Sequence, residues 1–157
     1  MADTYTQLYT HIVFAVKGRQ RLIPKQRKEA LHQYITRIIT NKKQTVIRIN
    51  SVPDHIHILV GMTPDIALSD LVRDIKANSS KFINKNEWIA GKFEWQTGFA
   101  VFSYSHSQLD AVVDYIKNQE AHHSRLTFRE EYLAFLKRFN VPYNPKYVFD
   151  SDDELET

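Results

Sequence analysis

The alternation of two hydrophobic periodicities along the chain restricts its fold more than any other feature. Stretches rich in β-branched and aromatic residues, which favour strands, occupy residues 5–16, 45–50, 55–62 and 98–106. Apolar residues at the spacing of a buried helical face occupy residues 25–40, 68–75, 109–116 and 127–139. The predicted order is therefore strand, helix, strand, strand, helix, strand, followed by two further helices.

This order matches the split βαβ arrangement of ferredoxin-like α+β folds. It predicts a four-stranded antiparallel sheet with helices packed on one face, plus C-terminal helices. The chain has 157 residues, of which 43% are apolar, enough for the core of one domain. We expect a single domain over residues 1–149 and a flexible tail over residues 150–157, where five of the eight side chains are acidic.

Charge is divided unevenly along the chain. Residues 1–50 contain ten Lys or Arg and two Asp or Glu, a balance of +8, whereas the other 107 residues contain eleven and sixteen, a balance of −5. Because the tail holds five of those acids, the body of the domain is basic. A basic body suits a polyanion such as nucleic acid, although surface lysines can also serve solubility alone.

Two absences narrow the chemistry and the location. The chain has no cysteine, which excludes disulfides, thiolate metal sites and thiol nucleophiles, so a metal would bind nitrogen and oxygen ligands. The start MADTYTQLYT lacks a basic stretch followed by an apolar core, and no apolar run approaches the roughly 20 residues that span a bilayer. We expect a cytoplasmic protein with no membrane partner.

Two histidines stand out in the segment PDHIHILV. His55 and His57 are two apart on a predicted strand, so both imidazoles share one face while Ile56 and Ile58 face the other way. Two imidazoles on one strand can bind a divalent ion, but they leave its coordination incomplete and require a third ligand. The alternative is a half-exposed strand that carries two polar residues outward.

The third helix supplies a candidate partner for this pair. Ser107 and Asp110 are expected to begin it, and Tyr115 and Gln119 lie one turn apart beside its apolar stripe. A phenol has a pKa near 10 and attacks a phosphate best when a cation polarises that phosphate. A glutamine carbonyl one turn on could complete the metal site, whereas the alternative is a tyrosine at the edge of the core.

The combination of motifs resembles one family. DHIHILV and YIKNQEAHH, with LVRDIKANSSKFIN and FEWQTGFAVFSYS between them, resemble the TnpA family of single-tyrosine transposases, His-hydrophobe-His enzymes of small insertion sequences. The resemblance runs from about residue 5 to residue 149. Related repeat-associated tyrosine transposases usually continue the tyrosine helix with Asn-Pro, so the Asn118-Gln119 found here favours the insertion-sequence branch.

The resemblance implies a reaction and a set of roles. Tyr115 would attack a phosphodiester of single-stranded DNA, forming a 5′-phosphotyrosine and releasing a 3′-hydroxyl that can later reseal the strand. His55, His57 and Gln119 would hold Mg²⁺ or Mn²⁺ against the scissile phosphate. Family members recognise DNA hairpins and form homodimers in which the tyrosine helix of one subunit can complete the other subunit's metal site.

Two histidines and five basic residues lie outside the expected metal and tyrosine site, and two alternative functions stay open. His122 and His123 follow Gln119 on the same helix, and we expect neither to bind the metal. One alternative is a non-enzymatic nucleic-acid-binding module of ferredoxin-like order, and another is a metallohydrolase in which the histidines activate water and Tyr115 is dispensable. The expected phosphate contacts are Lys17, Arg19, Arg21, Arg73 and Lys76.

Overall fold

A computed structural model describes residues 3–123, 125–145 and 148 of the chain. The expected acidic tail at 150–157 lies outside the described residues. The four strands are β1 (Leu8–Ala15), β2 (Thr45–Val52), β3 (His55–Met62) and β4 (Ala100–Tyr104). The helices are α1 (Lys28–Asn41), α2 (Leu68–Lys85), α3 (Leu109–Lys117), α4 (Gln119–His123) and α5 (Phe128–Arg138), with short 3₁₀ turns at Lys17–Arg19, Lys25–Arg27 and His106–Gln108.

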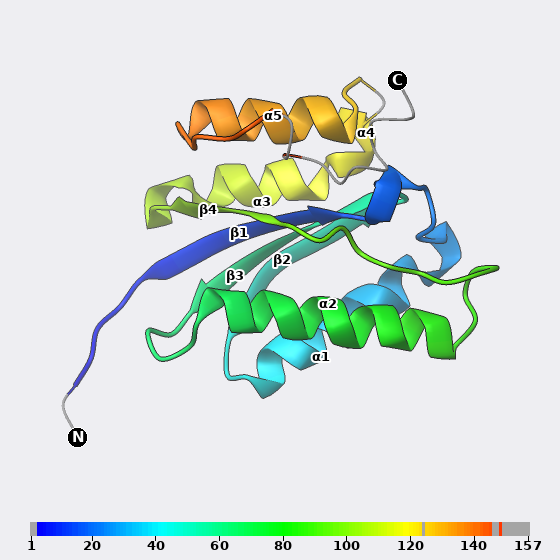
Figure 1. Ribbon diagram of the computed structural model, residues 1–157. Helices are drawn as coiled ribbons and strands as arrows, with labels where there is room; N and C mark the ends of the chain where they lie inside the picture. The colour runs from blue at the N-terminus through cyan, green and yellow to red at the C-terminus, as the bar shows by residue number, and fades with distance from the viewer. Residues whose placement is uncertain (1–2, 124, 146–147, 149–157) are drawn as a thin grey trace.

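The strands form one antiparallel sheet in the order β2-β3-β1-β4 (Figure 1). This arrangement confirms the predicted α+β, split βαβ fold. Strands β1 and β3 occupy the centre, where His57 pairs with Val13 and His55 pairs with Ala15. The central position means that the two histidines lie on a strand held by hydrogen bonds along both edges.

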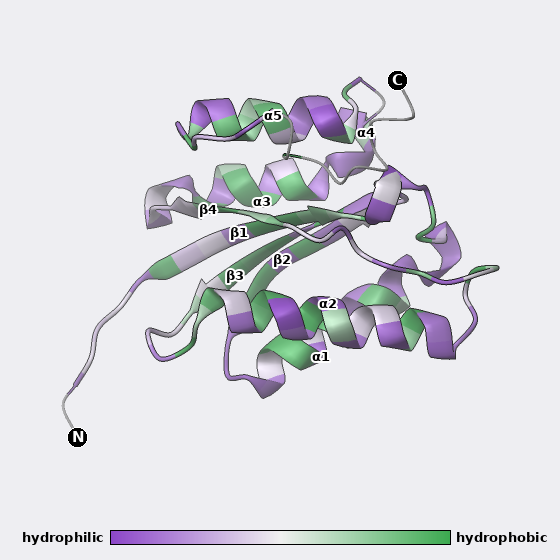
Figure 2. Cartoon of the chain, in the orientation of Figure 1, coloured by the Kyte–Doolittle hydropathy of each residue, from purple (hydrophilic) through white to green (hydrophobic). Residues whose placement is uncertain are grey.

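Helices cover both faces of the sheet. Figure 1 shows α1 and α2 on one face and α3, α4 and α5 on the other, and Figure 2 shows apolar residues concentrated on the strands between these two layers. Ile56 and Ile58 of β3 are fully buried in the core beneath α1 and α2, as the period of two requires. The side chains of His55 and His57 therefore face α3, α4 and α5.

A second core holds α5 against the sheet. Val13 and Phe102 of the sheet belong to one buried cluster with Phe128 and Phe135 of α5. The helix begins as predicted, because the Thr127 hydroxyl accepts a hydrogen bond from the Glu130 backbone N–H at 3.2 Å. Its packing places α5 directly over the histidine face of β3.

Three helix boundaries differ from the sequence-based expectation. Helix α2 continues to Lys85 through the polar residues near position 79, because the buried Ser79 hydroxyl donates to Ile75 O at 2.5 Å and accepts from Trp95 Nε1 at 2.9 Å. The turn before α3 begins after Ser105, whose backbone N–H donates to Gln108 Oε1 at 3.0 Å, so Ser107 is not the cap. The third boundary is the end of α3.

Helix α3 ends at Lys117 instead of continuing through Gln119. The Asn50 side chain on β2 donates to Ile116 O at 2.8 Å and to Lys117 O at 3.2 Å, and so satisfies two carbonyls at the helix terminus. This contact fixes the end of α3 beside the strand that pairs with β3. Within the described part of the chain, none of the helices combines the length and apolar character needed to cross a bilayer.

Candidate metal and tyrosine site

His55 and His57 form the floor of the candidate site. Both side chains are fully buried rather than half-exposed. Nδ1 of His55 donates to Asp54 Oδ1 at 2.6 Å, and Nδ1 of His57 lies 2.7 Å from Nε2 of His11, a buried histidine of β1. Because a partner holds each Nδ1, both rings present Nε2 toward the space under α5.

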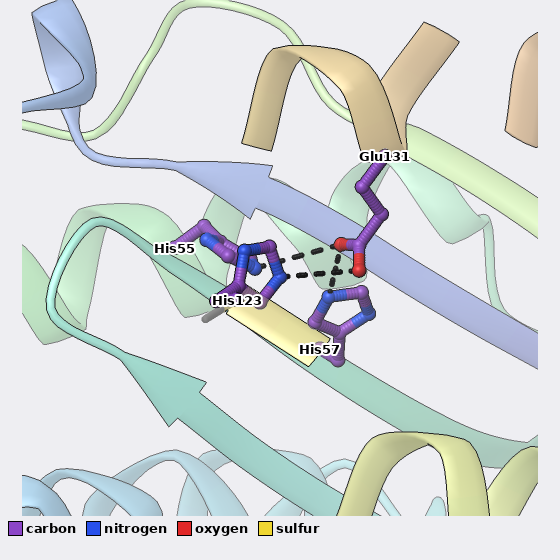
Figure 3. A group of neighbouring side chains, drawn as sticks. All are labelled: His55, His57, His123 and Glu131. Carbon is purple, nitrogen blue, oxygen red and sulfur yellow. Dashed lines mark hydrogen bonds and ion pairs between the residues drawn. The ribbon is translucent and has the colours of Figure 1, made fainter. Parts of the chain in front are cut away.

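Glu131 of α5 occupies that space. Its Oε1 atom lies 2.8 Å from Nε2 of His57 and 3.5 Å from Nε2 of His55 (Figure 3). The Glu131 side chain is 2% exposed, so this carboxylate is removed from water. The sequence pattern predicts α5 as a helix, but nothing in that pattern indicates that Glu131 belongs to the site.

Helix α4 adds a third histidine to the cluster. Nε2 of His123 lies 3.1 Å from Glu131 Oε2 and 2.9 Å from the carbonyl oxygen of the Gln119 side chain. We expected neither histidine after Gln119 to bind the metal, and the structure places His123 within the cluster. Gln119 is fully buried, and within the described residues its side chain contacts His123 and the Tyr115 carbonyl.

Tyr115 reaches the same carboxylate from α3. Its hydroxyl donates a short hydrogen bond to Glu131 Oε2, and its ring stacks on His122 with centroids 4.6 Å apart. Tyr115 is partly buried and also packs beside the apolar stripe of α3. The predicted histidine pair and the predicted tyrosine thus converge on one group, Glu131, within a single chain.

The electrostatics of the cluster follow from burial and from these contacts. Burial would raise the pKa of Glu131, but hydrogen bonds from His123 and His57 and the charge interaction with His55 at 3.5 Å outweigh it and hold the pKa well below its usual range. Burial would lower the pKa of His55, yet contacts with Asp54 and Glu131 raise it. Glu131 is therefore ionised beside a histidine that retains its proton more readily than usual.

The pKa shifts of His57 and Tyr115 both favour the neutral form of the side chain. Burial lowers the pKa of His57 despite the contact with Glu131. Burial raises the pKa of Tyr115, and the negative charge of Glu131 and the hydrogen bond to it raise it further. In this arrangement the phenol is a proton donor, so a nearby cation is needed to favour the phenolate.

The cluster has the dimensions of a metal site. One ligand atom from each of His55, His57, His123 and Glu131 can be chosen so that all lie within 4.8 Å of one another. Two ligand atoms about 2.1 Å from one ion are about 3.0 Å apart at octahedral angles and about 3.4 Å apart at tetrahedral angles. Oε1 of Glu131 lies 2.8 Å from His57 and 3.5 Å from His55, and Oε2 lies 3.1 Å from His123, so separations of this order are present, with hydrogen bonds spanning the 2.8 and 3.1 Å contacts.

The five expected phosphate contacts fall into different environments. Lys17 pairs with Glu94 at 3.3 Å, and Arg19 lies in a short turn with φ 52°. Arg73 pairs with Asp70 at 3.2 Å and with Asp74 at 3.5 Å.

Lys76 and Arg21 differ in whether their charged groups are already bound within the chain. The Lys76 ammonium donates to the carbonyls of Gln96 and Gly98 at 2.7 and 2.6 Å, which is a structural role. Arg21 is exposed and lines a cavity that also contacts His123. Of the five, Arg21 lies at a cavity that borders the histidine cluster.

Comparison with known proteins identifies the family of the chain. The profile of the family described as "Transposase IS200 like" matches residues 4–119. The ISDra2 transposase TnpA of Deinococcus radiodurans is 25% identical over 118 residues, covering 72% of this chain and 84% of the relative. The transposase for insertion sequence element IS200 of Salmonella typhimurium is 24% identical over 131 residues, covering 76% of this chain and 81% of the relative.

Solved structures share the fold. A crystal structure described as that of a candidate transposase from Deinococcus radiodurans superposes with a TM-score of 0.60 and 22% identity, covering 76% of this chain and 95% of the other. A REP-associated tyrosine transposase bound to a REP hairpin superposes with a TM-score of 0.61 and 16% identity, covering 80% and 74%. With a family profile that spans both histidines, Tyr115 and Gln119, the chain belongs to the IS200-like transposase family.

Proposed function

We propose that this transposase cleaves and rejoins single-stranded DNA through Tyr115 with the help of a divalent metal ion. The observation that carries the proposal is the convergence of Tyr115, His55 and His57 on the Glu131 carboxylate. A nucleophile and candidate metal ligands that meet at one point can act on the same phosphate. Both come from one chain, so the proposed site is complete in cis.

The residues of the cluster have distinct proposed roles. Tyr115 loses its phenolic proton and forms a bond from its oxygen to phosphorus, and the 3′-oxygen of the preceding nucleotide leaves and takes up a proton, so the step releases no net proton. The product is a 5′-phosphotyrosine and a free 3′-hydroxyl, and attack by a 3′-hydroxyl on that linkage reverses the step. Because the covalent linkage conserves the bond energy, resealing requires no nucleotide cofactor.

The bound metal ion would neutralise charge on the scissile phosphate and offset the negative charge of Glu131 near the phenol. Nε2 of His55 and Nε2 of His57 are the proposed ligands, because each Nδ1 already has a partner. Glu131 is the proposed third ligand. Gln119, the ligand expected from the sequence, instead orients His123 through the 2.9 Å contact.

Of Mg²⁺ and Mn²⁺, the donor set favours Mn²⁺. Two imidazoles and one carboxylate, with His123 beside them, make a nitrogen-rich site, whereas Mg²⁺ prefers oxygen ligands and retains its water. Two further proposals rest on relatives. The chain recognises hairpin DNA, since one structural neighbour is bound to a REP hairpin, and it forms homodimers, as its family resemblance implies.

The test is covalent trapping on DNA. A single strand that carries a palindrome from the DNA flanking the gene, labelled at its 3′ end, is incubated with protein and Mn²⁺ and analysed under denaturing conditions. We expect a labelled protein–DNA adduct, because the 5′-phosphotyrosine retains the 3′ part of the strand. The adduct should be absent with Tyr115→Phe and with a chelator.

Tyr104→Phe is the matched control, because Tyr104 is a partly buried tyrosine of β4 that also lies near His11. It should form the adduct as the parent protein does. An adduct that persists in Tyr115→Phe would show that another residue is the nucleophile. DNA binding without any adduct, unaffected by chelation, would favour the non-enzymatic binding module.

A further inference from the structure

A cavity of about 570 Å³ opens beside the histidine cluster. Asp54 and His123 form part of its wall, so the cavity borders the site through the partner of His55 and through the third histidine. Its volume lies within the range of roughly 300–1,000 Å³ that is usual for pockets that bind small ligands. No step of the proposed reaction described above uses this cavity.

The rim of the cavity is positively charged. Arg21, Lys25 and Arg125 line it and are exposed, and none of the three forms an ion pair with any part of the chain that the structure describes. The two acids of the wall are already engaged, since Asp54 bonds to His55 and Glu120 pairs with Lys28 at 3.2 Å. Arg21 and Lys25 also interact with Asp54 and Glu120 at longer range, but without an ion pair among the residues described, so the cations of the cavity outnumber its acids and can contact a phosphate.

The inner wall of the cavity is apolar. Ile23 and Phe128 are buried there, and Leu126 is 41% exposed at the mouth. An inorganic anion gains no binding energy from contact with this apolar surface. A nucleobase does, because base faces pack on apolar and aromatic side chains. The cationic rim suits the phosphates of a nucleotide, and the apolar wall suits its base.

We propose that this cavity binds one unstacked nucleotide of the DNA strand, next to the phosphate that Tyr115 attacks. Its base would pack against Leu126, next to the small part of Phe128 that lines the cavity, and its phosphates would contact Lys25 and Arg125. A base in a duplex is stacked on both sides and cannot enter such a cavity, so the site selects single-stranded DNA. The inference rests on the proposed function and adds a binding site for one nucleotide of the substrate strand beside the metal cluster.

The first experiment measures strand binding without chemistry. Fluorescence anisotropy with a labelled single strand of about 12 nucleotides, in chelator, compares the parent protein with Lys25→Gln/Arg125→Gln. We expect roughly tenfold weaker binding, because contacts to charged groups are lost. We also expect a salt dependence of log K that is smaller by about 1.4, or about 0.7 for each phosphate contact.

A matched double variant controls for net charge. Lys43→Gln/Lys85→Gln removes the same two charges from exposed sites that do not line the cavity, and Lys43 precedes β2 at the end remote from His55. This variant should bind the strand within about twofold of the parent protein. Equal weakening by both double variants would overturn the proposal, because general electrostatics would then explain the binding.

A second experiment distinguishes a nucleotide from an anion. Thymidine 3′,5′-bisphosphate and inorganic phosphate are each titrated against the labelled strand as competitors. We expect the bisphosphate to compete at least about tenfold better and Leu126→Ser to remove that advantage. Equal competition by phosphate would reduce the cavity to an anion site and overturn the assignment of the base.

Tyr115→Phe separates this inference from the proposed reaction. It should bind the single strand as tightly as the parent protein while forming no adduct. If the parent forms the adduct but the cavity variants bind normally, only the nucleotide site is wrong. If the cavity variants weaken binding but no protein forms an adduct, the proposed reaction is wrong and the nucleotide site stands.

Discussion

Glu131→Gln is the substitution that most directly tests the cluster. Glutamine keeps the volume and planarity of the side chain but loses its charge and replaces one acceptor oxygen with an N–H donor. In the parent protein, the carboxylate accepts from His57 at 2.8 Å, from His123 at 3.1 Å and from the Tyr115 hydroxyl. The amide can satisfy only part of this set of donors.

The structure sets the expected size of the effect. A hydrogen bond to a charged group contributes about 1.5–3 kcal/mol, and breaking a buried charged pair costs about 3–5 kcal/mol. Glu131 is 2% exposed, so solvent does not screen the loss. We expect the metal-free variant to lose about 3 kcal/mol of stability, or about 6–12 °C in Tm for a domain of this size.

Metal adds a second readout. At a Mn²⁺ concentration about 100 times its Kd, the parent protein should gain about 2.7 kcal/mol from binding. If Glu131 is a ligand, a tenfold loss of affinity in Glu131→Gln reduces this gain to about 1.4 kcal/mol at the same concentration. Thermal unfolding in chelator and in Mn²⁺, together with titration calorimetry, measures both quantities in one pair of proteins.

Glu130→Gln provides the matched comparison. Glu130 is the exposed neighbour on the same helix, and a glutamine there can still contact the Thr127 hydroxyl as Glu130 does at 3.1 Å. Its unfolding and Mn²⁺ binding should match those of the parent protein. A Glu131→Gln protein as stable as the parent, with unchanged Mn²⁺ affinity, would refute the assignment of Glu131 to the cluster and its metal.

Three further predictions concern pH, subunit arrangement and helix capping. Burial, with the charges of Lys28 and Arg48, lowers the pKa of His32 from 6.5 to about 4. Between these two pH values the unfolded chain therefore binds a proton that the folded chain does not. The free energy of unfolding should fall by about 2–3 kcal/mol from pH 6.5 to pH 4. Denaturant titrations of His32→Gln should show a smaller fall, whereas the exposed control His106→Gln should show the parental one. Because His57 and Tyr115 meet within one chain, mixing His57→Gln with Tyr115→Phe should not restore the adduct, and recovery to about a quarter or more of parental yield would indicate a site shared between subunits. Thr127→Ala should lose about 1 kcal/mol of stability to denaturant through loss of the cap of α5, and Thr127→Ser should lose little.

The sequence was sufficient for local and periodic features of the fold. Alternation along β3 correctly assigned Ile56 and Ile58 to one face and both histidines to the other, since strand geometry permits no other arrangement. The Thr127–Glu130 spacing correctly placed the start of α5. These predictions succeeded because each depends on residues that are neighbours along the chain.

The sequence was insufficient where a contact joins distant segments. Glu131 lies 74 residues from His57, and nothing in the local pattern of α5 distinguishes it from the exposed Glu130. The end of α3 depends on the Asn50 side chain, which reaches Ile116 across 66 residues. Gln119 and His123 are one turn apart on α4, so their contact is local, but the approach of His123 to Glu131 depends on the packing of α4 against α5.

The charge asymmetry of the chain acquires a structural explanation from these contacts. The basic first 50 residues supply Arg21, Lys25 and Lys28 to the cavity beside the site. The acidic remainder supplies Glu131, which faces the histidines instead of the cavity rim. Cations thus line the proposed path of the phosphates, and the buried carboxylate lies where a divalent ion can offset its charge. The rest of the chain also contributes Arg125, Asp54 and Glu120 to this cavity, but Asp54 bonds to His55 and Glu120 pairs with Lys28. Four cations therefore face two engaged acids in the cavity, which favours a polyanion there, while Glu131 is held apart beside the histidines, where a divalent ion can bind.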